Sequence, residues 1–183
     1  MSLLHWFLVS AVVVSAISAW CDLRTGHIPN WVTLGPLFIA PIAHAGTQIF
    51  AATLSAAAEI ALTSVIGALV CAIVPLVLYR AGAIGGGDVK LLAALGAICR
   101  PLVGIEIQFY SFLAAALIAC AHLAYEGKLM RVFGNTLTIA LNPFLPKERR
   151  RKLTPEMMTS VRFGPAIFLG ALAATILNWR ASW

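Results

Sequence analysis

The chain has 183 residues and a net charge of +6; 61% of its residues are hydrophobic and only 11% are charged. Soluble domains usually carry about 25% charged residues, and a chain of this length cannot enclose so much apolar surface. The composition therefore excludes an ordinary soluble protein. It predicts an all-α membrane protein, because a helix satisfies its own backbone hydrogen bonds inside the bilayer.

Six helices are predicted in chain order, within one membrane-embedded domain that covers residues 1–183. They span residues 3–20, 31–45, 56–79, 89–99, 102–125 and 163–179. We expect one turn at His44, Gly46 and Gln48 and another at Arg100-Pro101. The fourth helix is too short for about 30 Å of hydrocarbon. A water-filled recess or a thinned bilayer is therefore expected beside it.

The first helix is predicted to remain in the protein rather than to act as a cleaved signal peptide. The first basic residue is Arg24, so the basic region that opens a signal peptide is missing. The apolar stretch is also long enough for a membrane span.

Basic residues gather in connections on one predicted side of the membrane. The connection 126–160 alone contains Lys128, Arg131, Lys147, Arg149, Arg150, Arg151 and Lys152. The positive-inside rule therefore places this connection in the cytoplasm and the N-terminus outside. The same orientation puts Asp22 and Asp88 at the cytoplasmic face. We interpret the positive charge as a topology signal and expect the lipid bilayer, not nucleic acid, as a partner.

Asp22 and Asp88 are the two aspartates of the chain, and each lies where an apolar run meets a polar connection. A carboxylate at such a place in a membrane protein is a functional candidate by default. Two of them brought together can share a proton and activate a water. The plainer alternatives are that Asp88 is a helix N-cap and that Asp22 only marks the end of the first helix.

The residues that follow or precede the two aspartates are candidates for shaping a site. Gly85, Gly86 and Gly87 permit a close approach of another helix or of an extended peptide. Lys90 is either a cation that favours the ionised form of Asp88 or a lysine that extends to the membrane interface. Between the first two helices stand Ile28, Pro29 and Asn30, where the proline suits the first turn of a helix.

The four cysteines are Cys21, Cys71, Cys99 and Cys120, and no two of them form a Cys-x-x-Cys pair. We predict no disulfide, no metal site and no cofactor. Cys21 has no paired histidine within a motif, which disfavours a cysteine protease, and His27 is expected to be a solvated loop residue.

These residues together resemble the type IV prepilin peptidase family of membrane aspartic proteases. Asp22 is followed by Ile28-Pro29-Asn30, and the family's Gly-x-Gly-Asp signature is filled by Gly85, Gly87 and Asp88. The segment 162–166, which includes Gly164-Pro165, resembles a Gly-Pro stretch of the family. The six-helix order with a long connection before the last helix agrees as well.

The resemblance implies an aspartic endopeptidase with Asp22 and Asp88 as its catalytic residues. Its substrate would be a prepilin, cut at the cytoplasmic boundary of the inner membrane between a short basic leader and an apolar helix. Longer relatives carry an insert with paired Cys-x-x-Cys that is associated with N-methylation, and this chain lacks the pair. It therefore looks like the short form of tight-adherence (Flp-type) pilus systems, related to preflagellin peptidases, without methyltransferase activity.

Two functions of other classes remain as alternatives. A small ion-coupled transporter also uses intramembrane acids and broken helices, but it predicts carboxylates near the bilayer midplane and an internal repeat. A non-catalytic membrane scaffold predicts that Asp→Asn variants remain functional. The sequence makes no prediction about the oligomeric state.

Overall fold

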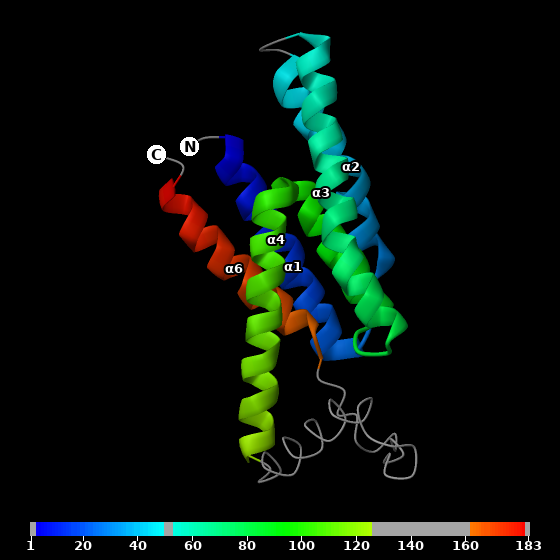
Figure 1. The fold of residues 1–183 in the computed structure, drawn as a ribbon, viewed down its shortest axis with the longest axis vertical. Coiled ribbons are helices and arrows are strands. Elements are labelled where there is room, and N and C mark those ends of the chain that lie inside the picture. Colours follow the sequence, from blue (N-terminus) through cyan, green and yellow to red (C-terminus); the bar gives the residue numbers. More distant parts are fainter. Residues whose placement is uncertain (1–2, 50–52, 126–161, 182–183) are drawn as a thin grey trace, which may run out of the picture. The chain divides into compact units, whose positions relative to one another are not determined.

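The computed structural model describes residues 3–49, 53–125 and 162–181. This part of the chain is all-helical, as predicted (Figure 1). Its helices are α1 (Leu3–Thr25), α2 (Asn30–Ile49), α3 (Leu54–Arg80), α4 (Gly86–Tyr125) and α6 (Gly164–Ala181). The connection 126–160, on which the topology prediction largely depends, lies outside the described residues.

The chain forms two compact units, one of residues 1–115 with 162–183 and the other of residues 116–161. In the first unit α1 packs against α6 and α2 packs against α3. All residues of the candidate site described below belong to this unit. Of the second unit, the structure describes residues 116–125, the carboxyl-terminal part of α4.

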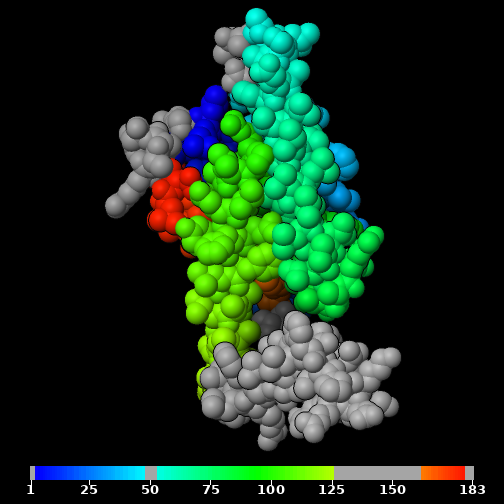
Figure 2. Space-filling view, viewed as in Figure 1, coloured from blue at the N-terminus to red at the C-terminus, as the bar shows by residue number. Residues whose placement is uncertain are grey.

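Within the described ranges, three helices, α1, α3 and α4, are long and apolar enough to cross a membrane. On the face shown in Figure 2, α3 presents an outer surface of side chains. Its large apolar residues recur every three or four positions and are 41–63% exposed: Leu62, Ile66, Leu69, Ile73 and Val77. Such an exposed apolar stripe suits lipid rather than water. Exposed apolar helices of this length are those of an integral membrane protein.

Helix α1 continues past the predicted end at residue 20, so Asp22 lies inside its last turn. The prediction that Asp22 follows the helix is wrong, because local hydrogen bonds extend the helix. Thr25 Oγ1 donates to Cys21 O at 2.8 Å. The N–H of Gly26 donates to Asp22 O at 2.9 Å, and Gly26 ends the helix with a φ of +67°.

Helix α2 also continues through the turn predicted at His44, Gly46 and Gln48. His44 is buried, its ring stacks on Phe7 with centroids 3.8 Å apart, and its Nε2 lies 2.9 Å from Ile98 O. These contacts with α1 and α4 stabilise the additional helical turn. The turn was predicted from polar residues and a glycine alone. The contacts of the His44 ring with two other helices could not be read from that local pattern.

Helix α4 is broken at Arg100, where φ is 63° and ψ is 174°, as expected from Arg100-Pro101. Pro101 has no N–H, so Ala97 O lacks the donor that an unbroken helix would supply. Ser64 Oγ of α3 donates to that carbonyl at 2.7 Å instead. The first segment of α4 is thus held by α3 at the break, which positions its other end, where Asp88 lies.

Candidate functional site

A cavity of about 270 Å³ lies where the end of α1 meets the starts of α2 and α4. Its lining residues are Asp22, Gly26, His27, Ile28, Asn30, Gly85, Gly86, Gly87, Asp88 and Lys90. The structure therefore brings together all the predicted catalytic and site-shaping residues except Pro29. Two segments about sixty residues apart form one site, because the chain between them forms an antiparallel pair of helices, α2 and α3, that returns to the same end (Figure 1).

Asp22 enters the cavity from the last turn of α1 and is only 8% exposed. Its Oδ2 accepts a hydrogen bond from the N–H of Gly164, the first residue of α6, at 3.0 Å. A Cβ added at Gly164 would lie 2.8 Å from both Cβ and Oδ2 of Asp22. No side chain fits there unless the end of α1 and the start of α6 move apart, because the Cβ of Asp22 is fixed to the backbone.

Arg162 strengthens the attachment of α6 to this end of α1, because its Nη1 donates to Leu23 O. Arg162 and Gly164 were not among the predicted site residues. Their only sequence signal was the resemblance of the segment 162–166 to a family motif, which suggested no contact partner. In the structure, these two residues hold the end of α1 that carries Asp22 through their hydrogen bonds.

Asp88 is the third residue of α4 and is also only 8% exposed. Its Oδ2 accepts from the N–H of Gly85 at 3.1 Å. Gly85 holds the N-cap position, so Asp88 closes the first turn from the third helical position, as in half of a capping box. The N-cap alternative for Asp88 is therefore wrong by three residues.

The three glycines before Asp88 differ in the space around them. A Cβ at Gly85 would lie 3.2 Å from Asp88 Oδ2, and one at Gly87 would lie 3.1 Å from Ile28 Cβ. Both distances are tighter than ordinary contacts. A Cβ at Gly86 would lie 3.5 Å from the Tyr79 ring, an ordinary van der Waals distance. A Cβ at the first or third position therefore requires its neighbour to move by a few tenths of an ångström, whereas a Cβ at the second position fits at an ordinary contact distance.

A series of alanine variants tests this difference. We expect Gly86→Ala to leave the activity of the site unchanged, while Gly85→Ala and Gly87→Ala each lower kcat/KM roughly tenfold by shifting Asp88 or Ile28. The measurement is kcat/KM for cleavage of a leader-bearing peptide by the three purified variants. Equal effects at all three positions would contradict the packing argument.

The remaining predicted residues support the cavity wall. Lys90 Nζ donates to Asn30 Oδ1 at 3.0 Å and so joins the starts of α4 and α2. Pro29 lies outside the cavity lining, and its carbonyl accepts from the N–H of Val32 at 3.1 Å in the first turn of α2. His27, expected as a solvated residue, is exposed and lies at the cavity.

Comparison with protein families gives one result for this chain. The model of a family described as the type IV leader peptidase family matches residues 7–120. The matched region extends from α1 into α4 and includes both Asp22 and Asp88. Comparisons with curated proteins and with solved structures found no match.

Proposed function

This chain belongs to the type IV leader peptidase family, and we propose that it is a membrane aspartic endopeptidase that removes the leader of a prepilin. The observation that carries the proposal is the pair of buried carboxyl groups, Asp22 and Asp88, on one cavity. Each binds one backbone N–H through Oδ2. Each therefore keeps a second oxygen, Oδ1, for water or for substrate.

The proposed reaction uses the two aspartates as a pair that shares one proton. The ionised carboxylate takes a proton from water, and the resulting hydroxide oxygen attacks the carbonyl carbon of the scissile bond. The protonated partner donates to the carbonyl oxygen. The aspartate that took the proton from water gives it to the amine nitrogen as the C–N bond breaks, and the other aspartate takes its proton back from the tetrahedral intermediate. These steps release the leader and the mature chain. Because the pair titrates as a unit, the roles of base and acid belong to the pair and not to one particular aspartate.

The proposed substrate is a prepilin with a short basic leader followed by an apolar helix. The cavity of about 270 Å³ beside Asp88 provides room for extended substrate backbone. We propose that the enzyme lies in the inner membrane as one six-span domain, with the cavity at the cytoplasmic face and the N-terminus outside. In this arrangement the scissile bond meets the carboxylates at the membrane boundary. We do not propose that the enzyme also methylates the mature chain.

The test is a cleavage assay with the full-length protein in lipid vesicles. The probe is a synthetic peptide with a basic leader and an apolar helix of about 20 residues. Mass spectrometry should find one cut at the boundary between leader and helix. An intact peptide after incubation with folded protein would overturn the proposal and favour the transporter or scaffold alternatives.

A further inference from the structure

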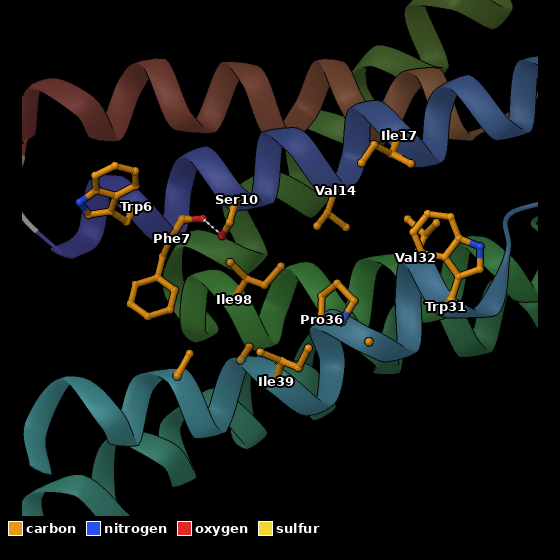
Figure 3. Close-up of a pocket in the computed structure, with 13 residues that line it drawn as sticks. Trp6, Phe7, Ser10, Val14, Ile17, Trp31, Val32, Pro36, Ile39 and Ile98 are labelled. Atoms are coloured by element: carbon orange, nitrogen blue, oxygen red, sulfur yellow. Dashed lines mark hydrogen bonds between the residues drawn. The ribbon is translucent and has the colours of Figure 1, made fainter.

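A second and larger cavity lies between α1 and α2 and has a volume of about 500 Å³ (Figure 3). It is a groove, which we call the α1–α2 groove, and Ile98 of α4 contributes to its wall. Its α1 side runs from Trp6 to Ile17 and its α2 side from Trp31 to Ala43. None of its lining residues among the described part of the chain is charged.

The length of the groove fits a short helix. At about 1.5 Å per residue, the α1 side is about 16 Å long and the α2 side about 18 Å. That length holds about three turns of an apolar helix, roughly half of the hydrocarbon thickness. Ser10 is the one hydroxyl-bearing residue of the lining, and its Oγ is already bonded to Phe7 O at 2.8 Å (Figure 3).

The groove has exposed edges and a buried floor. Trp31 and Ile39 are 69% and 63% exposed, whereas Val32 and Ala40 are only 3% and 5% exposed. A Cβ added at Gly35 would meet nothing within 4 Å, so the groove is open at this position. Small residues on a helix surface let the backbone of another membrane helix approach closely. The surface therefore suits a packed helix.

The groove begins next to the candidate catalytic cavity along the chain, at the start of α2. Ile28 and Asn30 line the catalytic cavity, and the next residues, Trp31 and Val32, line the groove. On α1, Asp22 lies on the first cavity and Ile17, five positions before it, on the second. A helix in the groove would therefore begin beside the two carboxyl groups.

We propose that the α1–α2 groove binds the apolar helix of the substrate, on the carboxyl-terminal side of the scissile bond. This inference rests on the proposed function, because it takes the substrate to be a leader joined to an apolar helix. The leader boundary then lies at Asp22 and Asp88, while the first three turns of the helix lie along Trp31 to Ala43. The groove thereby selects substrates in which an uncharged helix follows the cut.

Filling the groove tests this assignment. Gly35→Leu places a side chain in the open part of the groove, where an added Cβ meets nothing within 4 Å, and we expect KM for the leader-bearing helix peptide to rise at least about tenfold. Gly46→Leu is the matched control: it lies on the same helix, also has nothing within 4 Å of an added Cβ, and does not line the groove. Its KM should stay that of the unmodified protein. Equal KM values for the two variants would overturn the proposal.

A binding measurement separates this proposal from the peptidase assignment. The probe is the apolar helix alone, without a leader or a cleavage site, carrying a photo-reactive side chain near its amino end. Cross-links to unmodified protein in vesicles should map to residues at the start of the groove, such as Trp31, and be lost in Gly35→Leu but not in Gly46→Leu. Groove cross-links from a protein that cleaves no peptide would support the helix site and overturn the peptidase. Cross-links confined to other surfaces would overturn the helix site.

A lipid acyl chain is the competing occupant, and the same experiment addresses it. A photo-reactive phospholipid should lose its cross-links to the groove when the helix peptide is added in excess. Lipid cross-links that persist undiminished would overturn the proposal, since one groove cannot hold both at once.

Discussion

Replacing either aspartate with asparagine, as Asp22→Asn or Asp88→Asn, should lower kcat for leader cleavage roughly 100- to 10,000-fold, the usual contribution of a general acid or base. Asparagine has nearly the same shape, and its side-chain oxygen can still accept the N–H of Gly164 or Gly85. What the amide lacks is the ability to take up and release a proton. The measurement is single-turnover cleavage of the leader-bearing peptide in vesicles.

Glu59→Gln is the matched control for this pair. It also removes one carboxylate from a helix, but Glu59 is exposed on α3 and lies outside the cavity. Its kcat should equal that of the unmodified protein. All three variants should insert into membranes and elute as folded protein in detergent. Full activity in either aspartate variant would contradict the proposed pair and would agree with a scaffold role.

Gly164→Ala is expected to reduce kcat on the order of 100-fold, although Gly164 carries no chemical group that could react. The added Cβ would lie 2.8 Å from Cβ and Oδ2 of Asp22, so the end of α1 must shift away from α6, and the carboxylate moves with it and away from the N–H of residue 164. A displacement of about 1 Å at a reacting group can cost about 100-fold in rate. The measurement is kcat at saturating peptide, together with thermal stability in detergent.

Gly46→Ala serves as the control for Gly164→Ala, because an added Cβ there meets nothing within 4 Å. It should keep the activity of the unmodified protein. Normal kcat in folded Gly164→Ala would mean that the position of the Asp22 carboxylate is not critical. Loss of the folded protein would likewise contradict the prediction, since the expected effect is confined to one end of α1.

Local chemistry determined much of this protein. Apolar composition requires helices in a bilayer, and Arg100-Pro101 breaks α4 because proline removes a backbone donor. Asp22, Asp88 and the three glycines were recognisable as a candidate site, since carboxylates and consecutive glycines are unusual at the ends of apolar helices. Their catalytic roles and the orientation in the membrane remain predictions.

Only the tertiary structure decided which distant groups meet. His44 extends α2 because Ile98 O, 54 residues away, lies beside its ring. Gly164 holds Asp22 across 142 residues of sequence. The α1–α2 groove likewise depends on the spacing of two helices, which no run of residues encodes. The sequence alone therefore determined the apolar helices and pointed to the two carboxylates, because those follow from each residue's own chemistry. The hydrogen bonds and the open space around the carboxylates depend on helix packing, which brings together atoms that are remote along the chain.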